Sequence, residues 1–302
     1  MSTQAKLTLG PLLFHWPAET QRDFYFHIAD ETSIDCVYLG EVVCSKRGPF
    51  FAPYVKDVVA RLEGSGKQVI RSTLAMMTLD REVAAVRALA TSGAIIEAND
   101  VASLQELSGQ PHVIGPHINV FNEGAHDVLV TDGAVRLVLP VEINAQAVRV
   151  LAGRGVETEL LVFGRQPLSV AMRCYHARSH GLTKDACQFV CGLDPDGLAV
   201  DTIDGQELLA VNGIQTLSNG YQVLLHDLAA LRAMGVTHFR LSPQNIDMVA
   251  VARLYRGVLD GDRDLADAEA ELRTLTGATP WQNGFLHGRE GMSWVEPALA
   301  GG

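Results

Sequence analysis

The sequence predicts an α/β fold, a parallel (β/α) TIM-barrel-like domain, on two observations. Short apolar runs of strand length alternate with longer runs of helical spacing from one end of the chain to the other. About eight or nine such strand–helix units can be counted, and this number favours closure into a barrel over an open sheet. We therefore expect a single barrel-like domain over residues 1–302.

Composition agrees with this class and excludes others. The chain has 302 residues, of which 47% are apolar and 20% are charged, as is typical of a globular protein with a sizeable core. The net charge of -11 argues against a protein that binds the nucleic-acid backbone. Neither a signal peptide nor an uninterrupted apolar run of about 18 residues is present, so we expect a cytoplasmic protein without a transmembrane segment.

The first half of the chain keeps a regular order of strands and helices. Pro17, with Glu19 in the following turn, suits the start of a helix. Apolar residues between Phe51 and Leu62 repeat with helical spacing, and two glycines end that helix. Further helices begin near residues 80, 101 and 123. The expected strands of this half are 6–9, 34–39, 68–73, 94–98, 112–118 and 135–139.

The second half continues the alternation, with two departures. Strands are expected at 159–163, 208–212 and 237–241, and helices from near 144, over 224–234 and over 245–255. An irregular insert at about 172–204 has no convincing strand, yet it holds three of the five cysteines. The C-terminal segment, about 259–302, opens with an acidic stretch that is best interpreted as a solvated linker and helix face.

The cysteines carry the clearest chemical signal. A cytoplasmic protein keeps its thiols reduced, so five cysteines need a reason other than disulfides. Cys187 and Cys191 are four residues apart, which on a helix would put both sulfurs on one face. Cys174 precedes them across a stretch rich in Arg, His and Lys, which favours thiolates. Cys44 follows the second strand, and segments that follow barrel strands gather at one end of a barrel.

This pattern predicts a metal centre held by Cys44, Cys174, Cys187 and Cys191. A four-cysteine zinc site and an iron–sulfur cluster both remain open, although structural zinc sites more often carry a Cys-x2-Cys pair. Cys36 lies inside an apolar strand, and we interpret it as a buried packing residue.

Several longer strings resemble one known family. They are YLGEVVCSKR at 38–47, LGP at 9–11, WPAET at 16–20, GSGKQ at 64–68, STLA at 72–75, EAND at 97–100, AMRC at 171–174, ARS at 177–179, VNGIQT at 211–216 and RLSPQ at 240–244. Together they cover the chain from about residue 6 to 290. On these strings the chain resembles the collagenase-like peptidase family, and within it the branch that serves ubiquinone biosynthesis.

The resemblance implies a cofactor, a partner and a function. Members of this branch bind a [4Fe-4S] cluster through four cysteines, and the matching positions here are Cys44, Cys174, Cys187 and Cys191. They form a heterodimer with a homologous UbiU-like subunit and act in oxygen-independent ring hydroxylation of ubiquinone precursors. Cys36 has no counterpart in that pattern. The resemblance assigns no catalytic residue.

Three other functions compete with this expectation. A collagenase-like peptidase is suggested by kinship, but the sequence contains no recognisable nucleophile or zinc-protease motif. A zinc-stabilised, non-enzymatic interaction module would use the same cysteines. A hydroxylase that acts on RNA belongs to the same chemical class, although the acidic charge of the chain makes it less attractive.

Overall fold

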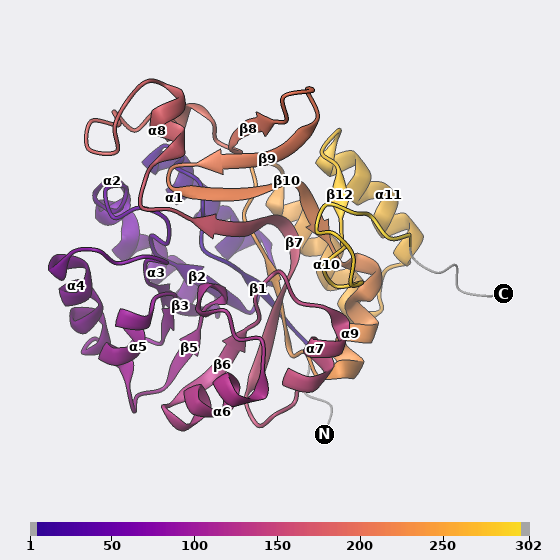
Figure 1. The fold of residues 1–302 in the computed structure, drawn as a ribbon. Coiled ribbons are helices and arrows are strands. Elements are labelled where there is room, and N and C mark those ends of the chain that lie inside the picture. Colours follow the sequence, from indigo (N-terminus) through magenta and orange to yellow (C-terminus); the bar gives the residue numbers. More distant parts are fainter. Residues whose placement is uncertain (1–4, 297–302) are drawn as a thin grey trace.

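Eight parallel strands close into a barrel at the centre of the computed structural model, which describes residues 5–296 (Figure 1). Strand β11 pairs with both β1 and β7, and this closes the ring, so the predicted barrel class is confirmed. The first four residues and the last six of the expected domain, 1–302, lie outside the described part. In ring order the strands are β1 (Lys6–Leu9), β2 (Cys36–Leu39), β3 (Gln68–Ser72), β4 (Ile96–Ala98), β5 (His112–Ile114), β6 (Ala134–Val138), β7 (Glu157–Val170) and β11 (His238–Leu241).

Helices lie around the outside of the barrel. Several of these helices begin with a side-chain cap. A backbone N–H of the first turn donates a hydrogen bond to the side chain of Asn122, Asn144 or Asp247 in three of them. The helices are α1 (Ala18–Glu31), α2 (Gly48–Phe51), α3 (Val55–Gly64), α4 (Asp80–Ala90), α5 (Val101–Leu107), α6 (Glu123–Thr131), α7 (Ala145–Leu151), α8 (Tyr175–Ser179), α9 (Leu228–Met234), α10 (Met248–Asp260) and α11 (Leu265–Thr276). Short 3-10 turns are η1 (Ala52–Tyr54), η2 (Pro116–Ile118), η3 (Val190–Leu193) and η4 (Leu225–Asp227).

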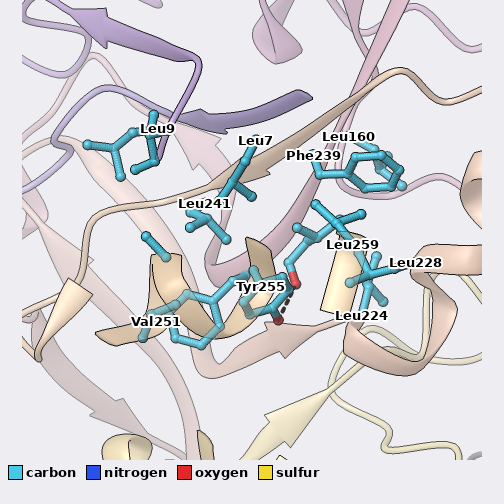
Figure 2. Close-up of a cluster of buried hydrophobic side chains, with 14 of the residues drawn as sticks. Leu7, Leu9, Leu160, Leu224, Leu228, Phe239, Leu241, Val251, Tyr255 and Leu259 are labelled. Atoms are coloured by element: carbon cyan, nitrogen blue, oxygen red, sulfur yellow. Dashed lines mark hydrogen bonds between the residues drawn. The ribbon is translucent and has the colours of Figure 1, made fainter. Parts of the chain in front are cut away.

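The largest apolar core lies between the barrel and helices from both halves of the chain, α1, α3, α7, α9, α10 and α11. Figure 2 shows Leu7 and Leu241 packed against Val251 and Tyr255 of α10. The Tyr255 hydroxyl, which is buried, donates a hydrogen bond of 3.1 Å to the carbonyl oxygen of Val162 in β7. This core therefore ties α10 to the barrel by both packing and a satisfied polar group.

Strand β7 is longer than its neighbours because it belongs to two structures. Its first half lies in the barrel, and its second half leaves the barrel and pairs antiparallel with β10 (Gln215–Val223), followed by β9 (Glu207–Asn212) and β8 (Leu198–Asp201). Gly164 lies where β7 leaves the barrel, and its φ is 114°. A Cβ at this position would lie only 2.8 Å from the Cβ of Ser242. Figure 1 shows the extension over one end of the barrel, with α8 beside it.

The structure corrects several expected elements. The strand expected at 208–212 exists, but it belongs to the antiparallel extension, and its partner β10 was not predicted. Strand β8 lies inside the insert that was expected to lack strands. The strand expected at 112–118 stops at Ile114, because Pro116 has no N–H to donate and starts a 3-10 turn. The acidic stretch runs from the end of α10, through a short connection, into the cap and first turns of α11.

The inside of the barrel holds a network of buried charges. Glu159 of β7 is completely buried, and its carboxylate lies 2.7 Å from Arg240 Nε and accepts a 2.6 Å hydrogen bond from the Thr8 hydroxyl. The hydroxyl of Tyr38 donates to the other carboxylate oxygen, and Arg240 also lies 2.8 Å from Glu97. These charges are paired within the barrel. Within residues 5–296, no helix is both long and apolar enough to cross a membrane.

Candidate functional site

The structure brings the four cysteines singled out in the sequence to one small cavity at the end of the barrel covered by the antiparallel extension. Cys44 lies beyond the carboxyl end of β2, Cys174 precedes α8, Cys187 lies in an irregular loop and Cys191 lies in η3. The cavity is also lined by apolar and basic residues: Lys46, Arg47, Lys184, Phe189, Val190, Gly213 and Ile214. All five cysteines of the chain are free thiols.

Local hydrogen bonds hold Cys44 in its turn. A carboxylate oxygen of Glu41 accepts hydrogen bonds from the backbone N–H groups of Val43 and Cys44, at 2.8 and 2.9 Å. The carbonyl oxygen of Cys44 accepts another from the backbone of Arg47 at 2.9 Å. Burial raises the pKa of Glu41, while Arg47 and the two N–H groups oppose that rise. The turn therefore has a defined shape before any ligand binds.

The other side of the cavity is fixed by Asn212 and Arg47. The Asn212 amide donates to the carbonyl oxygens of Cys191 and Asp194, at 3.0 and 2.9 Å. Its own oxygen accepts a 2.6 Å hydrogen bond from Arg47, which also donates to Leu13 at 3.2 Å. Arg47 and Asn212 thus connect the turn after β2 with η3. Sequence reasoning missed both roles, although both residues lie in the strings that carry the family resemblance.

Cys174 acts as the cap of α8. Its sulfur accepts a hydrogen bond of 3.4 Å from the backbone N–H of Ala177. Cys187 and Cys191 do not lie on one helix, since Cys187 is in an irregular loop and Cys191 in η3. Gln188 and Phe189, between them, both have positive φ angles, 48° and 55°, which a right-handed helix cannot contain. The loop turns sharply there, and both thiols line the cavity.

Burial controls the acidity of the thiols. It raises the pKa of Cys44, Cys174 and Cys191, while the charge of Arg47 opposes the rise at each of them. Metal binding would therefore release protons from these groups. Lys46, Arg47 and Lys184 are placed to offset the negative charge that four thiolates would bring.

The spacing of the sulfurs bears on the kind of centre that fits. In the described residues, no three of these thiols lie within 4.8 Å of one another. A single zinc ion with Zn–S bonds of about 2.3 Å would draw its four sulfurs to about 3.8 Å apart. No three of the thiols are therefore already placed as ligands of a single zinc ion, and they would have to draw together to bind one. Four cysteines around one cavity are the donor set that an iron–sulfur cubane uses.

Cys36 lies apart from the other four. It is 2% exposed at the start of β2, and its sulfur lies 3.7 Å from Arg136 Nη1. Burial raises its pKa to about 12. Cys36 packs in an apolar cluster with Tyr38, Ile70 and Val113 and does not line the cavity of the other four.

A second hollow opens at the mouth of the barrel, with a volume of about 330 Å³. His117, Asn119 and Glu142 line it, and His117 also lines an inner hollow that reaches Glu97 and Arg240. Burial lowers the pKa of His117 to about 4, so the imidazole is neutral at pH 7. Leu13 and Val42, on the inner hollow, belong to the same apolar cluster as Cys174. The sequence did not distinguish His117 from an ordinary loop or core histidine.

Comparison with known proteins gives a family and two distant likenesses. The model of peptidase family U32 matches residues 25–296. The chain is similar to Xanthomonas albilineans dihydropteroate synthase in complex with indole-2-carboxylic acid and 6-chloroguanine, with 13% identity, a TM-score of 0.42 and coverage of 89% of this chain and 93% of that one. It is also similar to the tryptophan synthase complex from Pyrococcus furiosus, with 12% identity, a TM-score of 0.37 and coverage of 88% and 95%. Neither structure informs the chemistry of this chain.

Proposed function

We propose that this chain, which belongs to peptidase family U32, the collagenase-like family, is a UbiV-like protein. In this proposal Cys44, Cys174, Cys187 and Cys191 bind a [4Fe-4S] cluster. The chain then acts in the cytoplasm with a homologous UbiU-like subunit in the oxygen-independent hydroxylation of ubiquinone precursors. No catalytic residue is assigned.

One observation carries the proposal. Four free thiols, drawn from segments more than a hundred residues apart, line a single cavity that three basic side chains also line. Buried thiols used only for packing have no need of such convergence, and disulfides are absent from the described residues.

The chain's own residues would have three tasks at this centre. The four cysteines would hold the cluster, which when bound supplies one-electron redox chemistry. Arg47 and Asn212 would keep the two sides of the cavity in register through their shared hydrogen bond. The apolar cluster around Cys174, including Leu13 and Val42, would keep water from the cavity on its barrel side.

The biological test is complementation in cells that lack the corresponding gene. We expect the wild-type chain, expressed with its homologous partner, to restore ubiquinone formation without oxygen, and Cys174→Ser to fail. Co-expressed partner and chain should elute together as a heterodimer in gel filtration. Restoration by Cys174→Ser, or elution of separate monomers only, would contradict the proposal.

A peptidase is the alternative that the family name suggests. It predicts turnover of a peptide substrate by the purified chain, abolished by a single Ser or Glu substitution that leaves the cysteines intact. The UbiV-like proposal predicts no such turnover. A proteolysis assay on the wild-type protein therefore separates the two functions.

A further inference from the structure

A second group of metal-binding side chains lies beside the cysteine cavity and contains no cysteine. His176 lies on α8, His180 caps the C-terminal end of α8, and Asp194 caps η3. One ligand atom of each residue lies within 4.8 Å of the ligand atoms of the other two. Within residues 5–296, this is the one group of three or more His, Cys, Asp or Glu side chains that meets this limit.

The tautomer of His176 is set by the backbone. Its Nδ1 lies 3.3 Å from the carbonyl oxygen of Val211. A carbonyl oxygen can only accept, so Nδ1 carries the hydrogen and a neutral ring presents a lone pair at Nε2. Histidines that bind metals are usually held in this way, with the second ring nitrogen donating to a carbonyl or carboxylate.

The Nε2 of His176 faces a carboxylate. His176 is fully buried, and its Nε2 lies 2.9 Å from Asp194 Oδ2. A lone pair and a carboxylate oxygen this close repel each other unless they share a positive charge. The ring of His180 stacks parallel to that of His176, with 5.4 Å between centroids. It brings a second imidazole to the same place.

We propose that His176, His180 and Asp194 bind one divalent transition-metal ion. Two imidazoles and one carboxylate suit zinc and its first-row neighbours, and water would complete the coordination. An ion with bonds of about 2 Å holds its ligand atoms about 3.3 Å apart, so the ligand atoms must shift slightly, and His176 Nε2 and Asp194 Oδ2 must move apart from 2.9 Å. His180 is exposed at a helix end, where its Nδ1 lies 3.0 Å from the carbonyl oxygen of His176.

The ion would link the two segments that hold Cys174 and Cys191. Asp194 is also the residue whose carbonyl oxygen Asn212 holds. Binding at this site would therefore fix α8 against η3. The inference goes beyond the proposed function, since it describes a separate centre that uses none of the four thiols.

Cobalt(II) is the probe for this site. Equilibrium dialysis of the full chain, purified without oxygen, should show that wild type binds one more cobalt ion per chain than His180→Ala or Asp194→Asn. The control is His27→Ala, because His27 is an exposed histidine that pairs with a single carboxylate, Glu31. This variant should bind as much cobalt as wild type. Equal cobalt binding by all four proteins would overturn the proposal.

A second measurement needs no variant and so does not depend on how the variants fold. In histidine-selective nitrogen NMR of the wild-type protein, zinc should shift the Nε2 signals of two of the ten histidines. Nδ1 of His176 should stay protonated. Zinc that moves no histidine signal would also overturn the proposal. Neither experiment measures iron or sulfide, so failure of this metal-site proposal can be told apart from failure of the cluster proposal.

Discussion

The two ends of strand β2 put cysteines into opposite environments. Cys36 begins the strand, is almost completely buried and packs against aromatic and aliphatic side chains beside Arg136. Cys44 lies beyond the other end, half-buried, at a cavity that three further thiols share. The role of a cysteine therefore depends on its place in the fold. A thiol inside a strand packs against its neighbours, whereas a thiol on converging loops is available as a ligand.

The polar groups of the two regions differ in the same way. Inside the barrel, Glu159 is met by Arg240, Thr8 and Tyr38 within hydrogen-bond distance. The cysteine cavity instead gathers four thiols, which are weak hydrogen-bond donors, and three basic side chains. Glu159 therefore has its charge and hydrogen bonds met by protein groups, whereas the cysteine cavity has the composition of a site that binds a ligand.

The largest expected effect is on the stability of the barrel. Glu159→Gln removes a buried charge whose two arginine partners stay behind, so we expect a loss of about 3–5 kcal/mol in the free energy of unfolding. Denaturant unfolding of the apoprotein measures it. Asp30→Asn is the control, because Asp30 pairs with Arg61 at the surface and both side chains are exposed. Equal losses in the two variants would show that the interior network is no more important than a surface pair.

The same network predicts a dependence on acid. Burial raises the pKa of Glu159, but Arg240 and Arg136 together lower it further, to about 2 from an ordinary value of 4.5. The carboxylate therefore stabilises the fold fully above about pH 4.5, and this contribution is lost as the pH falls toward 2, on the order of 3 kcal/mol in all. The free energy of unfolding, measured between pH 5 and 2, should fall more steeply with decreasing pH for wild type than for Glu159→Gln. Parallel curves would contradict the assigned pKa.

The third prediction separates the two kinds of cysteine. Loss of one ligand should weaken iron binding by about 100-fold or more, since even outer-shell changes cost 10–100-fold. We expect this of Cys44→Ala, Cys174→Ala, Cys187→Ala and Cys191→Ala. Cys36→Ala is the control and should keep its iron. Visible absorbance of the anaerobically purified proteins compares all five, and a loss of absorbance confined to Cys36→Ala would reverse the assignment.

The smallest effect is expected at a residue that positions the site. Asn212→Ala removes the hydrogen bonds to the carbonyl oxygens of Cys191 and Asp194, so iron should be retained about 10-fold less well. Asn144→Ala, which removes an exposed cap of α7, is the control and should leave iron retention unchanged. Iron release to a chelator measures the difference. The same release rate in both variants would leave Asn212 with no part in holding the site.

Local patterns were enough to predict the barrel, and they failed where pairing depends on distant contacts. The barrel strands are short apolar runs between helices, so periodicity finds them. Strand β10 contains Asn219 and Gly220, which are typical of a turn, and it forms because β7 and β9 flank it. Only its partners in the folded chain identify it as a strand.

The sequence likewise predicted only part of the candidate site. Barrel topology was enough to expect Cys44 near the other three thiols. The path between Cys187 and Cys191 was not predictable, because the left-handed backbone at Gln188 and Phe189 has no glycine to signal it. The Arg47–Asn212 hydrogen bond joins residues 165 positions apart, and no local pattern reports such a contact.

The central claim is that four converging cysteines hold an iron–sulfur cubane, and elemental analysis tests it most directly. The chain, purified without oxygen, should contain iron and acid-labile sulfide in equal amounts, near the composition of one [4Fe-4S] cluster per chain. Zinc bound in place of iron, with no sulfide, would contradict it.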